Sequence, residues 1–246
     1  MQYLILSDIH ANWEALAAVL EQVAGRYDRV LCCGDLVGYC ADPNAVVEWV
    51  IKNVSAVVRG NHDKAAADIV DLDWFNPSAR MATFWTRKSL TAESLDYLRG
   101  MPKGPLPVEH FQLVHGSPLD EDEYITGLSE VWQIFDYLDK DLTFFGHSHI
   151  QGGFYRGWGR VDRIRKTDPK SDSFVLKLSD GVTYYLNPGS VGQPRDGDAR
   201  AAYVLYESEE RVATFARCPY DYSRTQVKIR EAGLPDILAD RLASGR

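Results

Sequence analysis

The sequence of 246 residues has only 4 cysteines, no long hydrophobic run and no excess of positive charge. Because no apolar stretch approaches the ~20 residues that span a bilayer, we expect no transmembrane helix. The start, Met1 to Ser7, lacks a basic segment and an extended hydrophobic region, so we expect no signal peptide. Cys32 and Cys33 are adjacent and no Cys-x-x-Cys motif occurs, which favours reduced thiols and a cytoplasmic location.

The net charge of −8 arises from 27 basic and 35 acidic side chains. Such a chain is a poor non-specific ligand for nucleic acid or an anionic membrane, since phosphate binding requires clustered Lys and Arg. A phosphate-containing ligand would therefore need a local positive charge, such as a metal ion. The 6 Trp, 13 Tyr and 9 Phe exclude a disordered chain and predict a globular protein with a substantial core.

In the first half of the chain, short apolar segments alternate with segments of helical periodicity. The predicted strands are Gln2–Ser7, Arg29–Cys33, Ser55–Arg59, Phe111–His115 and Leu142–Phe145. Predicted helix starts lie at Asn12, Asp42, Asn76, Thr91 and Ser129, with Pro43 and Pro77 in the first helical position after their caps. This alternation predicts a parallel sheet with helical crossovers.

The second half has a different pattern, with short strands separated by turn residues. We predict that these strands, Phe174–Leu178, Thr183–Leu186, Ala201–Tyr206 and Arg211–Ala216, form an antiparallel meander. Helices are predicted at Tyr222–Ala232 and Asp236–Ala243, and the basic stretch Arg156–Lys170 is predicted to be an exposed loop or excursion. The whole chain, residues 1–246, is thus expected to be one α/β (α+β) domain of two sheets with helices outside.

Five of the 6 histidines lie in short polar clusters that each follow a predicted strand. The clusters are Asp8-Ile9-His10, Gly34-Asp35, Gly60-Asn61-His62-Asp63, His115 and Gly146-His147-Ser148-His149. Because ligands bind outside the carboxyl ends of strands in open α/β sheets, we expect these side chains to meet at one edge.

The residue types in these clusters indicate a class of metal. The candidate ligands are Asp8, His10, Asp35, Asn61, His115, His147 and His149. Two carboxylates, one amide oxygen and four imidazoles, with no thiolate, suit Mn²⁺, Fe or Zn²⁺. The set is too large for one tetrahedral site. It fits two ions if one carboxylate bridges them, an arrangement that clamps the attacking and leaving oxygens of a displacement.

Taken singly, many of these residues could have a purely structural role. An Asp or Asn at a strand end is often a turn former or a helix cap. Arg59 and Arg195 could each meet a phosphate or form a salt bridge. Cys40 is expected in the core, and Asn187-Pro188-Gly189-Ser190 is expected to be a tight turn that braces the site. The prediction of a metal site therefore rests on the occurrence of all five clusters together.

In their order, the five clusters resemble the signature of the calcineurin-like metallophosphoesterases. The chain's size and its Asn187–Ser190 turn are similar to the small prokaryotic phosphodiesterase branch. This resemblance implies a four-layer αββα sandwich of two mixed sheets flanked by helices. It also implies that Asp8, His10 and His149 hold one metal, that Asn61, His115 and His147 hold a second, and that Asp35 bridges them. His62 would lie beside the substrate, with Asp63 orienting its ring and raising its pKa.

The resemblance implies a metal-dependent phosphoric ester hydrolase that acts on a small anionic substrate. Protein phosphatases of the family carry an Arg-Gly pair shortly after Gly-Asp, and the stretch Gly34–Cys40 lacks it, which disfavours phosphoproteins. We expect hydrolysis of a phosphate ester or anhydride, either a small phosphodiester or a dinucleoside polyphosphate. A metal-activated hydroxide would attack, His62 would be the general acid, and manganese is one candidate metal. A non-catalytic metal-binding scaffold and a nuclease remain alternatives, although the acidic charge disfavours nucleic acid.

Overall fold

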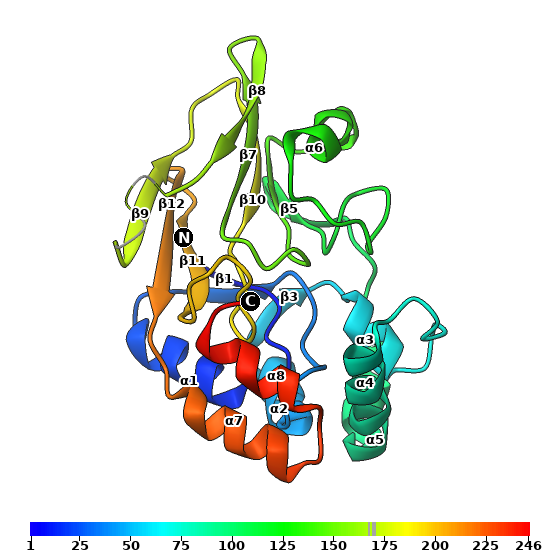
Figure 1. Ribbon diagram of the computed structural model, residues 1–246. Coiled ribbons are helices and arrows are strands. Elements are labelled where there is room, and N and C mark those ends of the chain that lie inside the picture. Colours follow the sequence, from blue (N-terminus) through cyan, green and yellow to red (C-terminus); the bar gives the residue numbers. More distant parts are fainter. Residues whose placement is uncertain (167, 169–170) are drawn as a thin grey trace.

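The computed structural model describes residues 1–166, 168 and 171–246, and in this part of the chain it contains two six-stranded mixed sheets (Figure 1). The first sheet has the order β3-β2-β1-β11-β12-β9. Its strands are β1 (Gln2–Leu6), β2 (Arg29–Cys32), β3 (Val54–Val57), β9 (Ser173–Lys177), β11 (Ala201–Glu207) and β12 (Val212–Cys218). Strands β1 to β3 are parallel to one another, and β11, β12 and β9 continue the sheet through antiparallel pairs.

The second sheet has the order β4-β5-β6-β10-β7-β8. Its strands are β4 (Leu106–Val108), β5 (Phe111–Leu113), β6 (Leu142–Phe144), β7 (Gly152–Gly157), β8 (Arg160–Ile164) and β10 (Thr183–Asn187). Strands β5, β6 and β10 are parallel, and antiparallel pairs add β4 at one end and β7 with β8 at the other. The predicted fold class, an α/β sandwich of two mixed sheets flanked by helices, is confirmed.

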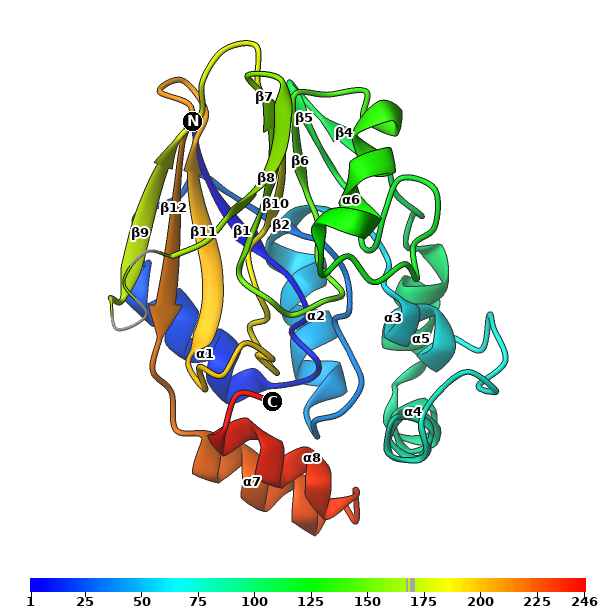
Figure 2. The same cartoon turned by 45° about the horizontal axis from the view of Figure 1, so that its top comes forward.

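Helices flank the two sheets (Figure 2). They are α1 (Trp13–Gln22), α2 (Pro43–Asn53), α3 (Asn61–Ala66), α4 (Pro77–Ser89), α5 (Ala92–Gly100), α6 (Leu128–Ile134), α7 (Tyr222–Glu231) and α8 (Asp236–Asp240), with 3₁₀ turns η1 (Phe135–Tyr137) and η2 (Arg241–Ala243). Asn12 and Asn76 cap their helices as predicted, by accepting from the amides of Ala15 and Ala79. The Asp42 side chain makes no cap bond and instead pairs with Lys228 at 2.8 Å.

The core is layered because successive side chains of a strand point to opposite faces. In β1, Tyr3 and Ile5 face the cluster of buried residues between the two sheets, whereas Leu4 and Leu6 belong to the cluster under α1 and α2. A third cluster packs α6 on the outer face of the second sheet. Strands buried on both faces explain why these segments are apolar throughout rather than alternating.

Two sequence-based predictions about the second half are wrong. The four strands do not form a meander: β10 lies in the second sheet between β6 and β7, whereas β9 pairs with β12 in the first. Turn signals mark where strands end but not which strand they pair with, so sequence order could not assign the sheet. Most of the expected loop Arg156–Lys170 is instead the β7–β8 hairpin, and positions 167, 169 and 170 lie outside the described residues.

The loops that follow β1, β2, β3, β5 and β6 carry the five polar clusters. Three of these strands belong to the first sheet and two to the second, so the candidate site lies where the carboxyl ends of both sheets meet. Among the described residues, no helix is long and apolar enough to cross a membrane.

Candidate metal centre

The predicted ligands form two adjoining groups of buried side chains. Asp8, His10, Asp35 and His149 form the first group, and Asp35, His115 and His147 form the second. Within each group the ligand atoms lie within 4.8 Å of one another, and Asp35 belongs to both. The structure therefore places one carboxylate between two sets of potential ligands, which is the arrangement that the resemblance implied.

In the first group, the nitrogen and oxygen atoms converge on one point. His10 Nε2 lies 3.6 Å from Asp35 Oδ2, and His149 Nε2 lies 3.4 Å from Asp8 Oδ1. The Nε2 atoms of His10 and His149 are 3.1 Å apart. Two ring nitrogens facing each other among carboxylate oxygens are well placed to share a cation.

The second group is built in the same way around His115. Its Nε2 lies 3.4 Å from Asp35 Oδ2 and 3.1 Å from His147 Nδ1. The Asn61 side-chain oxygen, 3.3 Å from the same nitrogen, joins this group. All seven predicted ligands are thus brought together.

The second ring nitrogen of each histidine donates to a backbone carbonyl and so fixes which nitrogen faces the cluster. His10 Nδ1 bonds Val37 O at 3.0 Å and His115 Nδ1 bonds Cys33 O at 2.7 Å. His147 Nε2 bonds Asp122 O at 3.0 Å, and His149 Nδ1 bonds Gln193 O at 2.5 Å. Burial lowers the pKa of His10, His147 and His149, which favours the neutral form that a metal requires.

The two carboxylates of this cluster lie in an environment that favours a bound cation. Asp8 and Asp35 are 0% and 1% exposed, and their ion pairs within the described chain are with histidines rather than with Lys or Arg. Burial raises the pKa of Asp8 to about 7. Burial acts in the same direction on Asp35, but the neighbouring His115 and His62 outweigh it and hold its pKa well below the usual range. Because buried carboxylates are costly without compensation, the cluster fits divalent metal binding.

The backbone around the cluster is held in an uncommon conformation. Five of the seven predicted ligands have a positive φ, namely Asp8 (52°), His10 (51°), Asp35 (55°), His147 (64°) and His149 (59°). Non-glycine residues adopt this region at a cost, and it persists where surrounding contacts enforce it. Here the amides of Asp8 and His10 bond the carbonyls of Gly34 and Asp35, at 2.9 and 3.0 Å.

The Asn187–Ser190 turn braces the cluster, as predicted. Asn187 Nδ2 donates to Gly146 O at 2.9 Å, and Ser190 Oγ donates to Asp8 O at 2.8 Å. The amide of Gly192, just after the turn, also donates to Asp8 O at 3.0 Å. These bonds tie the loop after β10 to the loops after β1 and β6.

The surroundings of His62 differ from the expectation in two ways. Asp63 does not hold its ring: the Asp63 carboxylate accepts from the amides of Leu36, Val37 and Gly60, and so ties two ligand loops together. The partner of His62 Nε2 is the Tyr39 hydroxyl at 2.9 Å. Burial also lowers the pKa of His62 to about 4, whereas we expected Asp63 to raise it.

The structure distinguishes the two arginines for which the sequence left both a phosphate contact and a salt bridge open. Arg59 forms a two-pronged ion pair with Glu121, at 3.0 and 2.9 Å. Arg195 has no carboxylate partner among the described residues and donates to Tyr39, Tyr124 and Gln193. Its Nε is buried without a hydrogen-bond partner. Arg195 therefore has one guanidinium N–H, at Nε, without a partner within the described chain.

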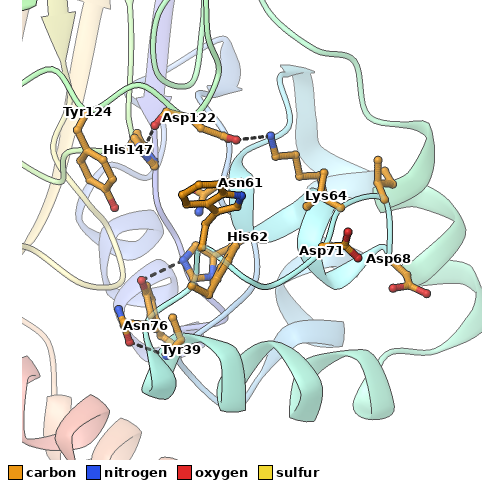
Figure 3. A pocket seen from close by; sticks show the side chains of 15 residues that line it. Tyr39, Asn61, His62, Lys64, Asp68, Asp71, Asn76, Asp122, Tyr124 and His147 are labelled. Carbon is orange, nitrogen blue, oxygen red and sulfur yellow. Dashed lines mark hydrogen bonds and ion pairs between the residues drawn. The ribbon is translucent and has the colours of Figure 1, made fainter.

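A cavity of about 780 Å³ adjoins the second ligand group. Figure 3 shows Tyr124 and His147 on one side of it and Lys64, Asp68 and Asp71 on the other. The sequence did not single out Tyr39, Tyr124 or Trp74, although all three line the cavity. Tyr39 could have been predicted near the site because it follows Gly34-Asp35 closely in the sequence. Tyr124 and Trp74 lie in irregular loops with no motif, so the sequence did not indicate their place.

Comparisons with known proteins agree with this geometry. The family model described as "Calcineurin-like phosphoesterase superfamily domain" matches residues 1–211. The uncharacterized protein MJ0912 of Methanocaldococcus jannaschii is 34% identical over 98% of this chain and 97% of its own length. The crystal structure of a metallophosphoesterase from Sphaerobacter thermophilus is 40% identical, covers 100% of this chain and 99% of that one, and has a TM-score of 0.86. The hypothetical protein PH1004 from Pyrococcus horikoshii is similar in fold, with a TM-score of 0.79 at 20% identity and coverage of 100% and 98%.

The chain therefore belongs to the calcineurin-like phosphoesterase superfamily. Within that class it is a metal-dependent phosphoester hydrolase, with a buried Asp/His cluster that fits divalent metal ions.

Proposed function

We propose that the protein is a dinuclear phosphoesterase that hydrolyses a small phosphodiester or a dinucleoside polyphosphate. The observation that carries the proposal is the place of Asp35 in both ligand groups. One carboxylate shared by two sets of ligands serves two cations at once. Asp8, His10 and His149 would complete one site, and Asn61, His115 and His147 the other. The mixture of nitrogen and oxygen donors suits Mn²⁺, Fe or Zn²⁺.

When bound, two ions would supply Lewis-acid stabilisation of the phosphoryl group and lower the pKa of a water that acts as the nucleophile. The chain's own residues position the reacting groups. The ring nitrogens fixed by carbonyl bonds keep the ligands in place before substrate arrives, which limits reorganisation during the reaction. Arg195, with no carboxylate partner in the described chain, is placed to bond a phosphate oxygen.

His62 is the proposed general acid. It lines the cavity beside the cluster, and its Nε2 is held by the Tyr39 hydroxyl. A phosphate beside the ring favours the protonated imidazole, which can then pass its proton to the leaving oxygen. Asp63 contributes as a positioning residue, through the backbone of the Gly60 loop and the loop after β2.

The proposed partner is a small anionic, phosphate-containing molecule, bound in the cytoplasm. The four cysteines are all buried and free, which suits a reducing compartment. A nuclease would need a basic groove, and the cavity lining has one lysine against three aspartates.

The deciding experiment is hydrolysis of bis-p-nitrophenyl phosphate by protein reconstituted with Mn²⁺, Fe²⁺ or Zn²⁺. A panel of monoesters, cyclic nucleotides and dinucleoside polyphosphates then ranks substrates. We expect metal-dependent turnover of the diester. Tight metal binding without turnover of any member would identify a non-catalytic scaffold, and competition by polynucleotide would identify a nuclease.

A further inference from the structure

The cavity beside the cluster begins at the ligand residues themselves. Asn61 and His147, both from the second ligand group, line it together with His62. Its volume of about 780 Å³ lies within the range of small-molecule sites and exceeds what a single phosphate needs. A substrate group attached to the phosphate can therefore occupy this cavity.

The charge of the lining disfavours additional phosphates in this cavity. Lys64 is its one cation within the described chain, and it is already paired with Glu121 at 3.0 Å and Asp122 at 2.6 Å. Three aspartates line the same space: Asp122 is paired with Lys64, Asp68 is paired with Arg87 at 2.6 Å, and Asp71 has no ion pair within the described chain. An anionic group would be repelled here, so the cavity suits an uncharged group with hydrogen-bond donors.

The cavity also presents flat aromatic surfaces. Trp74 is 95% exposed, which leaves a large apolar ring in water, and Tyr124 is half exposed. The Tyr124 ring lies 3.8 Å from that of His147, at an angle of 38°. Phe75 meets the edge of the His62 ring at 5.0 Å. Exposed aromatic rings around a recessed site are suited to stacking on a planar ring of a ligand.

We propose that this cavity binds a nucleoside, joined through a sugar oxygen to the phosphate at the metal cluster. The base stacks on Trp74 and Tyr124, and Asp71 accepts hydrogen bonds from the sugar hydroxyls. This proposal rests on the proposed function and specifies its substrate. Because the cavity begins at the ligand residues and His62 also lines it, the nucleoside is on the leaving side. A hydroxide, formed when water gives one proton to solvent, bonds phosphorus and the bond to the sugar oxygen breaks. That oxygen takes the proton from His62, which regains one from solvent.

The test compares two diesters with similar alkoxide leaving groups, adenosine 5′-(methyl phosphate) and glycerol methyl phosphate. We expect kcat/KM of the metal-loaded protein to be at least about 5-fold higher for the adenosine ester, since stacking on an aromatic side chain is worth that much. Trp74→Ala should reduce kcat/KM for the adenosine ester roughly 5- to 150-fold and affect the glycerol ester far less. Trp74→Phe should retain most of the preference.

Trp132→Ala is the matched control. Trp132 is 60% exposed on α6, outside the cavity lining, so its removal should leave both rates unchanged. Because Trp74 is exposed, its removal should not unfold the chain, which circular dichroism checks. Adenosine alone should bind wild-type protein in calorimetry and lose that binding in Trp74→Ala.

The outcomes separate the two proposals. If bis-p-nitrophenyl phosphate is hydrolysed but the adenosine ester has no advantage, or keeps it in Trp74→Ala, the nucleoside site is wrong and the proposed function stands. If no phosphate ester or anhydride is hydrolysed, the proposed function is wrong. Calorimetry with adenosine then tests the nucleoside site independently of catalysis. If adenosine does not bind, the proposed nucleoside site is wrong.

Discussion

Asp35 is the residue on which both halves of the centre depend, since its carboxylate lies 3.6 Å from His10 Nε2 and 3.4 Å from His115 Nε2. Asp35→Asn keeps the shape but removes the negative charge that two cations share. We expect both metal affinities to fall by at least about 10-fold, the lower bound for disturbing even an outer residue of a metal site. Elemental analysis measures the loss, with exposed Asp139→Asn as control. Two ions retained at unchanged affinity would contradict a bridging role.

His62 should act on the leaving group without holding metal. We expect His62→Ala to slow an ester with an alkoxide leaving group by about 10²–10⁴-fold and a p-nitrophenyl ester much less, because p-nitrophenolate leaves unaided. Metal content should be unchanged. His110→Ala is the matched control, because His110 bonds Tyr206 away from the cluster. Equal slowing of both leaving groups would assign His62 to substrate positioning instead.

Arg195 should recognise the phosphate rather than the metals. A charged hydrogen bond is worth about 1.5–3 kcal/mol, so Arg195→Ala should weaken competitive inhibition by inorganic phosphate roughly 10- to 100-fold. Exposed Arg224→Ala on α7 is the control, and metal content should stay constant in both variants. An unchanged inhibition constant for phosphate would show that the guanidinium does not reach the anion.

At the scale of elements, the loop between β3 and α3 has no space for a side chain at Gly60. A Cβ on Gly60, which precedes α3, would lie 2.1 Å from Asp35 Oδ1. Gly60→Ala should therefore displace the shared carboxylate, abolish metal binding and lower the free energy of unfolding by about 1–3 kcal/mol. Gly100→Ala, where a Cβ meets nothing within 4 Å, is the control. Normal metal binding by Gly60→Ala, measured by calorimetry, would argue against this packing.

At the scale of the whole molecule, the centre joins the carboxyl ends of both sheets, so metal binding should stabilise the entire chain. At a free metal concentration of 1,000 times Kd, each ion contributes about 4 kcal/mol. Removing one ion with a chelator should thus lower Tm by roughly 8–16 °C for a chain of this size. Calorimetry should show a single transition before and after, because the two sheets share one buried cluster. A Tm insensitive to chelator and restored metal would contradict a metal site between the sheets.

The sequence by itself determined which side chains gather at the candidate metal centre and where most elements lie. Each predicted ligand lies in the loop that follows an apolar strand, and the carboxyl ends of parallel strands share an edge, so the local pattern was sufficient. The caps at Asn12 and Asn76 were predictable for the same reason, since a capping side chain bonds its own first turn. The bracing turn Asn187–Ser190 was also recognised, although its partners lie far away in the chain.

Only the tertiary structure decided which strands share a sheet and what surrounds the ligands. Pairing of β9 with β12, and of β10 with β6, joins segments whose local pattern fits either sheet. The Tyr39 hydroxyl, rather than Asp63, meets His62 because the loop after β2 lies against α3. Arg195 has no carboxylate partner within the described chain, because Tyr39, Tyr124 and Gln193 accept its hydrogen bonds. The cavity brings together Trp74, Tyr124 and Lys64 from three separate segments. Contacts between distant segments depend on how the elements pack in space, which local periodicity does not encode.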